Sequence, residues 1–497
     1  PVYYGDASRL PVLQAAGVAG SGNVSVYGST GSENSYLIDG LNTTDPVTAT
    51  FGTNFNYDAI QEINFMTGGF EAEFGQATGG IVNLVTKSGG NDFSGTLDVR
   101  YRDQEFYESG DHFDADEDQS YRTASATFGG PIVRDKVWFF ISAENIDNKA
   151  TPGPVEATDI QPETWNYTGW NYIGKATWQA TDATRAVLKI SGDPADIDNT
   201  NASPFTSPEA SSYQEQGGDI FQAEVSSVLS DSVLVDIQAG VNLQYIESGP
   251  MSGDLDTPGY YNATYGISFN NHYNFQDSDR DRTQFRGSIS YFADDLAGAH
   301  EFKAGIEYND LEFVSRNFYT GDGEHWVWDS ESGYVDLDGD SYSDYQFVTP
   351  SPLETARDET TSTGEVYTAY LQDAWRPISN LTIKPGVRYE TVAFENTVGT
   401  EVADFDEIQP RFGMAWDLRN DGKSVLRASW GRFLHPTALT IPNFISGRPD
   451  GYAVYLGMEW LCSYGFCDPD SPPPPEVFNT VVGEAIGDAP GTLVTTH

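Results

Sequence analysis

The most informative part of the chain reads GSENSYLIDGLNTTDP over residues 31–46 and EINFMTGGFEAEFGQATGGIVNLVTKSGG over residues 62–90. These stretches are rich in glycine, their apolar residues alternate, and they precede several hundred residues with the pattern of hairpins. Glycine permits tight turns and close backbone approach, as a small domain wedged into other structure requires. A glycine-rich domain followed by many amphipathic strands predicts a plugged β-barrel.

The strand pattern is clearest in residues 233–245, VLVDIQAGVNLQY, where one face carries Val, Val, Ile, Ala, Val, Leu and Tyr. The other face carries Leu, Asp, Gln, Gly, Asn and Gln. Because successive side chains of a strand point to opposite faces, the first face can meet lipid while the second lines a wet interior. The same alternation recurs over residues 97–102, 284–291, 302–308, 381–389 and 411–416.

The strands of a soluble β-sandwich also alternate between apolar and polar residues, so this fold is the competing interpretation. Three features favour a membrane barrel: strands of roughly nine or more residues, charges repeated on the polar face, and tight turns that alternate with long loops. We expect tight turns at residues 231–232, 376–380 and 419–423. We expect long polar loops at residues 151–165, 249–281 and 317–363.

The predicted fold class is all-β: a large antiparallel transmembrane β-barrel with a small α+β plug in its lumen. We expect a plug domain over residues 1–91, barrel strands over 92–436 and a Pro-rich extracellular loop region over 437–497. About fourteen strands are expected between Phe93 and Pro436, whereas a plugged barrel needs about 22. Since an open sheet edge in lipid is not allowed, we expect the chain to be a fragment that lacks closing strands.

The composition is strongly acidic, with 26 Lys+Arg against 74 Asp+Glu and a formal net charge of −48. Neutralising phosphates requires a basic surface, so we expect no nucleic acid partner. The acidity fits either a surface facing salt and divalent cations or a generally acidic proteome. The sequence contains no run of about 18 apolar residues, so it predicts no transmembrane helix. The chain starts at Pro1 without a leader, so we expect a signal peptide to have been removed.

Several motifs resemble those of one receptor family. Residues 36–40 (YLIDG), 62–75 and 79–87 (GGIVNLVTK) resemble the plug of TonB-dependent outer-membrane receptors. Residues 129–140 (GGPIVRDKVWFF), 370–375 (YLQDAW), 410–413 (PRFG) and 426–433 (LRASWGRF) resemble barrel strands of its Oar-like branch. The resemblance covers about residues 21–436, and the order and spacing of the motifs make it specific.

The resemblance implies a receptor in the outer membrane of a Gram-negative bacterium, with extracellular loops and a plug on the periplasmic side. It implies a TonB-type energy transducer, an unidentified extracellular ligand, and outer-membrane lipid and lipopolysaccharide as partners. The Oar-like branch is also associated with adhesion and protein export, so a surface adhesin or export conduit is the alternative function. A soluble β-rich lectin is a third possible function. The chain departs from the family pattern because it shows no TonB box, no leading β-sandwich and no C-terminal aromatic strand.

Ligand contacts are expected at the plug apices, residues 42–55 and 67–74. The candidate binding residues are Asn42, Thr44, Asp45, Phe51, Phe55 and Phe70. The sequence has no cluster of His or Met, which argues against a dedicated metal or haem importer. Siderophore, glycan and peptide stay open as ligands. No nucleophile elbow, Walker loop or zinc helix is present, so we expect no enzyme.

A calcium loop is the sharpest candidate metal site. Carboxylates at alternating loop positions can converge on one hard cation. The candidate ligands are Asp336, Asp338, Asp340, the Tyr342 carbonyl and Asp344. The loop resembles those of thrombospondin-type repeats, while Ser341 and Phe347 stand where an EF-hand needs Gly and Glu. The alternative is a solvated acidic turn. Weaker candidates are the triplets Asp114, Asp116, Asp118 and Asp277, Asp279, Asp281.

Cys462 and Cys467 are the only cysteines of the chain. Their spacing fits a small disulfide loop formed in an oxidising compartment. A metal pair is the weaker alternative, because no His or second pair of Cys lies nearby in the sequence.

Overall fold

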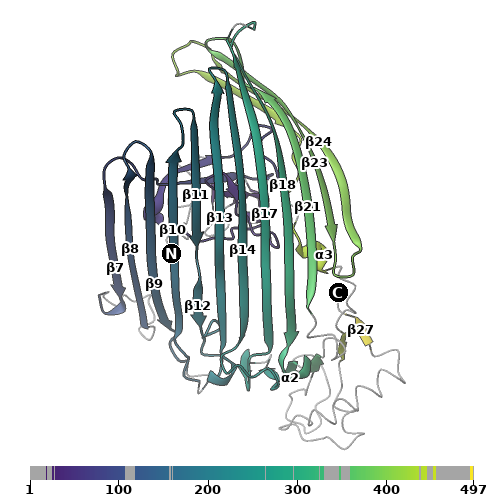
Figure 1. Ribbon diagram of the computed structural model, residues 1–497. Helices are drawn as coiled ribbons and strands as arrows, with labels where there is room; N and C mark the ends of the chain where they lie inside the picture. The colour runs from purple at the N-terminus through teal and green to yellow at the C-terminus, as the bar shows by residue number, and fades with distance from the viewer. Residues whose placement is uncertain are drawn as a thin grey trace, which may run out of the picture.

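The computed structural model describes residues 18–19, 25–26, 28–106, 118–155, 158, 160–262, 265–294, 296–323, 325–328, 346–348, 359–435, 438–444, 452–454 and 493–495. These residues are almost entirely strands and the turns between them (Figure 1). None of the helices in these ranges has both the length and the apolar character needed to cross a membrane.

One large antiparallel sheet, called the wall, dominates the molecule. It contains fifteen strands, and most of them pair with the strands that precede and follow them in the sequence. The strands are β7 (Ser94–Asp103), β8 (Asp118–Val133), β9 (Val137–Thr151), β10 (Trp165–Gln179), β11 (Thr184–Gly192), β12 (Ala195–Asp198), β13 (Ser212–Ser230), β14 (Val233–Pro250), β17 (Asn274–Ala293), β18 (His300–Tyr319), β21 (Thr360–Asp373), β22 (Trp375–Ile378), β23 (Leu381–Glu395), β24 (Glu401–Asp417) and β25 (Val425–Gly431). Among the described residues, β7 and β25 form the two ends of the sheet. The all-β, antiparallel architecture expected from the sequence is confirmed.

Short turns close one end of the wall, and most connections at the other end are longer, although residues 396–400 join β23 to β24. The turn expected over 376–380 is wrong in its first part, because β22 covers Trp375–Ile378. The turn at residues 231–232 joins β13 to β14, and residues 418–424 join β24 to β25. The expected loop over 249–281 is wrong in its last part, residues 274–281, because β17 already begins at Asn274. Acidic residues give this part of β17 the composition of a loop. Backbone pairing with β14 on one side and β18 on the other makes it a strand.

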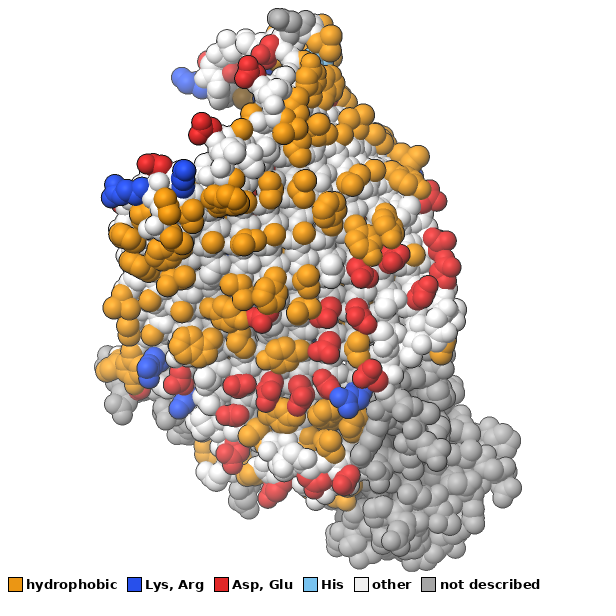
Figure 2. Space-filling view, viewed as in Figure 1, with side chains coloured by type: hydrophobic (Ala, Val, Ile, Leu, Met, Phe, Trp, Pro, Cys, Tyr) orange, Lys and Arg blue, Asp and Glu red, His pale blue; other side chains and the backbone are white. Residues whose placement is uncertain are grey.

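The outer face of the wall carries the apolar residues that the alternation predicts. Leu97, Val99, Ile237 and Ile306 are 81%, 66%, 44% and 57% exposed. Figure 2 shows such side chains as a broad orange field across the strands, with acidic side chains gathered toward the lower end. Side chains that are apolar and still exposed over many neighbouring strands fit a surface covered by lipid.

A second, four-stranded sheet forms the plug, described over residues 28–86. Its strands are β3 (Ser35–Ile38), β4 (Leu41–Asn42), β5 (Ile60–Met66) and β6 (Ile81–Thr86), and the two short 3-10 helices are η2 (Gly31–Glu33) and η3 (Tyr57–Ala59). β3 runs parallel to β6, whereas the other pairs are antiparallel. The turn between β3 and β4 needs positive φ at Asp39 (50°) and at Gly40 (82°), a conformation that glycine adopts without cost. Figure 1 shows the plug in purple behind the wall strands.

The remaining elements are short. A small sheet beside the longer connections contains β15 (Gly259–Asn262), β16 (Ile267–Phe269), β19 (His325–Trp328) and β20 (Gln346–Val348). The other short elements are β1 (Val18–Ala19), β2 (Ser25–Val26), η4 (Gln104–Phe106), η5 (Pro208–Ala210), α2 (Thr320–Gly323), α3 (Thr440–Phe444), β26 (Tyr452–Val454) and β27 (Leu493–Thr495). The calcium candidates Asp336, Asp338, Asp340, Tyr342 and Asp344 lie outside the described residues. So do Asp114, Asp116, Cys462 and Cys467.

Candidate functional site: the plug against the wall

The inward face of β17 holds the plug segment 40–45 along its length. Side chains at every second position of this strand face inward, so their spacing along the strand lets them reach successive plug residues. Arg280 pairs with Asp45 (2.9 Å), Arg282 donates to the Thr44 carbonyl (3.1 Å), Gln284 exchanges two hydrogen bonds with the Asn42 backbone (3.0 and 2.6 Å), and Arg286 donates to the Gly40 carbonyl (3.4 Å). The ladder fixes the register of the plug against the wall.

Asp39 is the centre of a first anchor, called the Asp39 anchor. Its Oδ2 lies 3.3 Å from Lys175 Nζ on β10 and 3.0 Å from Lys189 Nζ on β11. The same carboxylate accepts hydrogen bonds from the backbone N–H (2.8 Å) and hydroxyl (2.7 Å) of Thr86 in the plug. All three charged side chains are nearly buried, with exposures of 11%, 7% and 1%. Burial raises the pKa of Asp39, but Lys189 and Lys175 outweigh it and leave that pKa below 3.8.

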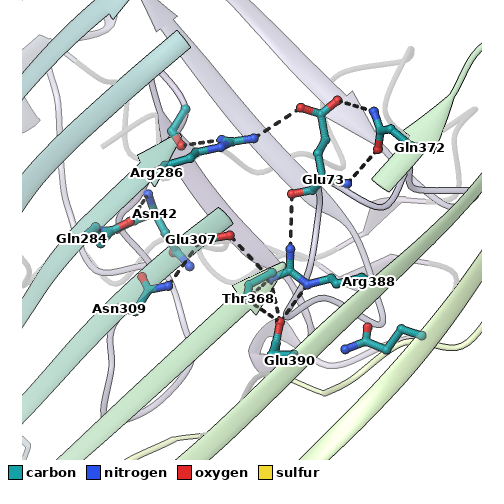
Figure 3. A network of polar contacts seen from close by, with 12 residues as sticks. Asn42, Glu73, Gln284, Arg286, Glu307, Asn309, Thr368, Gln372, Arg388 and Glu390 are labelled. Atoms are coloured by element: carbon teal, nitrogen blue, oxygen red, sulfur yellow. Dashed lines mark hydrogen bonds and ion pairs between the residues drawn. The ribbon is translucent and has the colours of Figure 1, made fainter. Parts of the chain in front are cut away.

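A second group of contacts, called the Glu71–Glu73 anchor, holds the following part of the plug; Figure 3 shows Glu73 with Arg286 and Gln372. Glu73 Oε2 lies 3.3 Å from Arg286 and 2.5 Å from Lys303 on β18. Gln372 of β21 donates to both Glu71 and Glu73 at 3.1 Å, and Lys384 of β23 pairs with Glu71. Here the acidic side chains of the plug again meet basic side chains of the wall, but in a wetter setting.

Arg388 on β23 connects this anchor to a buried network in the wall. Its guanidinium lies 2.6 Å from Glu390 and 3.5 Å from Glu307, and it donates to the Thr368 hydroxyl at 3.0 Å. It also reaches the Glu73 carbonyl at 3.5 Å, as Figure 3 shows. Arg388 is 1% exposed. A Cβ on the plug residue Gly75 would overlap this guanidinium, so glycine is needed there for close approach.

Apolar contacts supplement the polar ones. The ring of Phe70 meets Phe433 edge to face, with centroids 5.5 Å apart, and Arg411 lies over the Phe433 ring at 3.7 Å. Farther along the chain, the Leu439 N–H donates to the plug carbonyl of Pro46 at 2.9 Å. Leu439 also joins a buried cluster on the inner side of the wall, made with Val47, Leu311, Phe313, Val366, Val392 and Phe394.

A cavity of about 490 Å³ remains between the plug and the inner face of β7 to β10. Its volume lies within the range of about 300–1,000 Å³ that is usual for small-molecule sites. The plug contributes Phe51, Asn54, Phe55 and Tyr57. The wall contributes Arg100, Tyr101, Arg102, Tyr121, Thr123, Glu144, Ile146, Asn148, Tyr167 and Asn171. These wall residues lie toward the ends of the strands that carry the longer connections.

The side chains of the cavity are fixed by one another. Phe51 packs edge to face against Tyr36 (5.5 Å) and Phe55 (6.1 Å). The guanidinium of Arg102 lies 4.8 Å from the centre of the Tyr121 ring. Such aromatic and cation–π contacts are favourable and help to hold these side chains in place.

The structure separates the candidate binding residues into three groups. Asn42, Thr44 and Asp45 contact β17 and hold the plug. Phe51 and Phe55 line the cavity. Phe70 is buried with Leu37, Ala77 and Ile81 of the plug and packs against Phe433. Which of them contacts a ligand stays a prediction.

The weaker metal candidates Asp277, Asp279 and Asp281 lie on β17, where Asp277 pairs with Arg316 at 2.6 Å. Within the described ranges, no group of three or more His, Cys, Asp or Glu side chains is placed to hold a metal ion.

Sequence reasoning missed the wall residues that hold the plug. The signal was present, because only 26 residues of this chain are Lys or Arg, against 74 Asp and Glu. Lys175, Lys189, Arg280, Arg286 and Arg388 all stand on the polar faces of strands and meet carboxylates inside. Basic residues on the inner face of an acidic chain were therefore the available clue.

Comparison with known proteins agrees with this architecture. Residues 148–408 match the family model described as outer membrane beta barrel domain. A curated relative, the TonB-dependent transporter Oar of Myxococcus xanthus, is 23% identical over 515 residues, which cover 84% of this chain and 48% of the relative. The chain thus spans about half the length of this relative.

Solved structures of outer-membrane proteins share the fold. The outer membrane transporter YddB from Escherichia coli matches with a TM-score of 0.60 and 16% identity, over 84% of this chain and 55% of its own. The siderophore receptor PirA from Acinetobacter baumannii matches with a TM-score of 0.56 and 17% identity, over 81% and 55%. All three of these similar proteins are transporters or receptors.

Proposed function

This chain belongs to the family of outer membrane beta barrel domains, and from that premise we propose that it is a TonB-dependent receptor which admits an extracellular ligand past its plug. The chain lies in the outer membrane of a Gram-negative bacterium. The relative named Oar is a TonB-dependent transporter, and its similarity to this chain supports the same dependence here. In this proposal, a TonB-type energy transducer pulls on the plug from the periplasm.

The observation that carries the proposal is that ion pairs hold the plug against the wall. Its carboxylates Asp39, Asp45 and Glu73 pair with basic side chains on four different wall strands. The cost of removing buried charges from water offsets much of their attraction, so ion pairs whose partners regain water separate at lower cost than an apolar core of the same area. A domain held in this way can be displaced by an applied force and reseated, an order-to-disorder change of a known kind.

The surroundings of the plug fit the same function. The ligand would enter from the side of the longer connections, which we place outside the cell, and reach the cavity beside Phe51 and Phe55. The exposed apolar side chains of the outer face would contact membrane lipid. Lipopolysaccharide would surround the outer ends of the strands, since it forms the outer leaflet in the proposed setting.

A cysteine pair tests whether the plug moves. Ala72 of the plug is completely buried, and a Cβ on Gly386 of β23 would lie 3.0 Å from the Ala72 Cβ. A disulfide needs a Cβ separation of about 3.5–4.5 Å, so a small adjustment lets the Ala72→Cys/Gly386→Cys pair close. We expect an impermeant maleimide to label the single Ala72→Cys variant in energised cells. In the oxidised pair both thiols are consumed, so labelling should return only after the disulfide is reduced.

Two controls make the result specific. A disulfide from Ala223→Cys/Ala239→Cys, which face each other on β13 and β14, staples the wall without touching the plug. The unsubstituted protein gives the labelling background of Cys462 and Cys467. Labelling that persists after a protonophore, or after loss of the TonB-type protein, would contradict energy-driven displacement. Adhesion or export that continues unchanged in the oxidised Ala72→Cys/Gly386→Cys variant would then favour the alternative function.

A further inference from the structure

The ion pairs between the plug and the wall all have the same polarity. Over residues 28–86 the plug contains seven Asp and Glu and no Lys or Arg. Among the described residues, each salt bridge that joins the two parts therefore has its carboxylate on the plug and its cation on the wall. The plug is an anionic domain held by a basic inner face, although the whole chain carries a net charge of −48.

Two positions on the wall, called the double-cation sites, each direct two cations at one carboxylate oxygen. In the first, Asp39 Oδ2 lies 3.3 Å from Lys175 Nζ and 3.0 Å from Lys189 Nζ. The two lysines face each other directly across β10 and β11. Their side chains are 7% and 1% exposed, so this site lies almost entirely out of water.

The second double-cation site joins β17 to β18. Glu73 Oε2 lies 3.3 Å from the Arg286 guanidinium, as Figure 3 shows, and 2.5 Å from Lys303 Nζ. Hydrogen bonds from Arg and Lys to an oxyanion are roughly twice as strong as those between neutral groups. Both sites are therefore suited to an oxygen atom of a carboxylate or a phosphate.

Displacement of the plug would remove the carboxylate from both sites. The two cations of each site would then be neighbouring like charges on the inner face of the wall. Like charges repel more strongly where little water screens them. Arg280, which pairs with the plug residue Asp45, would lose its counter-charge as well. An anion that enters the opened space would relieve this repulsion.

Carboxylates of the wall offset this positive charge only in part. Glu307 and Glu390 lie 3.5 and 2.6 Å from Arg388, so a cation of the wall already compensates them. The other carboxylates beside the plug contacts are Asp193, Glu224 and Asp236. They stand against six cations, which are the four of the double-cation sites together with Arg280 and Arg282. Positive charge is therefore in excess where the plug has left.

We propose that the conduit opened by displacement of the plug is selective for anions, and that its cargo carries carboxylate or phosphate groups which replace the plug carboxylates at the double-cation sites. This inference rests on the proposed displacement of the plug and names the class of ligand. Lys and Arg side chains that line a pore select anions in the same way. A neutral cargo fits less well, because it would leave both sites uncompensated.

The ion selectivity of the opened protein tests the proposal. The purified protein is placed in a planar lipid bilayer. Urea is added to the concentration at which an Ala72→Cys variant reacts with maleimide while circular dichroism still shows the strands of the wall. The reversal potential in a gradient of KCl then gives the permeability ratio of chloride to potassium. We expect a ratio of at least about 3, because cations on a pore wall attract anions. A ratio at or below one would overturn the proposal.

Substitutions on β18 locate the selectivity. Lys303→Gln removes a cation from the inner face, and we expect it to lower the permeability ratio by roughly 1.5- to 3-fold. Arg316→Gln is the matched control, because Arg316 lies on the opposite face of the same strand and pairs with Asp277 at 2.6 Å. It should leave the ratio unchanged. An equal loss in both variants would show that the selectivity does not come from the inner face, and would overturn the proposal.

Rescue by an anion provides a second measurement that needs no open conduit. Glu73→Gln leaves Arg286 and Lys303 without their carboxylate. We expect inorganic phosphate to raise the Tm of this variant by about 2 °C or more relative to chloride at the same ionic strength. Glu62→Gln is the matched control, since Glu62 is an exposed residue of β5, and phosphate should give it no such gain. Phosphate that fails to favour Glu73→Gln would overturn the assignment of an oxyanion site.

These results separate the inference from the proposed function. An anion-selective conduit in urea, without labelling of Ala72→Cys in energised cells, would support the selectivity and reject energy-driven transport. Labelling in energised cells, together with a conduit that prefers potassium, would reject the ligand class and keep the receptor.

Discussion

The Asp39 anchor and the Glu71–Glu73 anchor join the same two parts of the molecule in different ways. At Asp39, one carboxylate meets two lysines that are 7% and 1% exposed, and it also bonds Thr86 inside the plug. At Glu71, the lysine partner Lys384 is 43% exposed. Solvent therefore competes for the second anchor and hardly reaches the first.

The difference indicates a division of labour within the plug. A buried ion pair loses much when one partner is removed, because a charge is left without compensation, whereas an exposed pair contributes little. The Asp39 anchor therefore contributes to the stability of the plug fold itself. The Glu71–Glu73 anchor contributes to the position of the plug against the wall and can be broken at lower cost. Displacement should start at the Glu71–Glu73 end.

Asp39→Asn should give the strongest destabilisation. It leaves Lys175 and Lys189 buried without a counter-charge, which costs about 3–5 kcal/mol in comparable sites. We expect a lower free energy of unfolding and faster proteolysis of the plug in detergent, measured against the unsubstituted protein.

The control for this prediction removes the lysines as well. Asp39→Asn combined with Lys175→Met and Lys189→Met should recover a large part of the lost stability, because no unpaired charge stays buried. A triple variant that is less stable than the single one would show that the carboxylate acts through Thr86 and not through the lysines.

Gly75→Ala should have an intermediate effect. The new Cβ would overlap the Arg388 guanidinium, which is buried and bonded to Glu390 and Thr368, so the network must shift. Overpacking of this kind costs about 1–3 kcal/mol. Gly90→Ala is the matched control, because a Cβ there meets nothing within 4 Å. Equal melting temperatures for the two variants would refute the close packing at Gly75.

Glu71→Gln should change stability little. Its partner Lys384 is 43% exposed, and exposed pairs contribute about 0–1 kcal/mol. The effect should instead appear in the maleimide labelling assay. We expect Ala72→Cys to react faster when it is combined with Glu71→Gln, because this segment of the plug is then held less firmly. A labelling rate equal to that of Ala72→Cys alone would argue against this anchor as the point of release.

Mild acid should have the smallest effect. The pKa of Asp39 lies below 3.8 in the folded protein, so its ion pairs contribute fully above that value and are lost only as the pH falls through the lower, folded value. The stability difference between the unsubstituted protein and Asp39→Asn should thus stay constant from about pH 7 to about pH 5. A difference that disappears already near pH 6 would show that Asp39 is not the group responsible.

The two faces of the wall also differ in how far sequence could predict them. The outer face follows from alternation alone, as in residues 233–245, because lipid imposes no partner with fixed geometry. The inner face is specified by partners far away in the chain. Asn42 and Gln284 bond across 242 residues, and no local pattern announces such a pair. For a similar reason the loop expected over residues 249–281 extends too far, because the acidic beginning of β17 has the composition of a loop but pairs with β14 and β18.

The same separation in sequence sets an order of events during biogenesis. Neighbouring strands of the wall are joined by turns such as residues 231–232, so each hairpin can close as soon as both of its strands are available. The contacts of Glu73 with Arg388 span 315 residues, and those of Asp39 with Lys189 span 150. The plug, which is synthesised before the wall, can then dock only after the wall strands are in place, and it must wait unseated until β23 has formed.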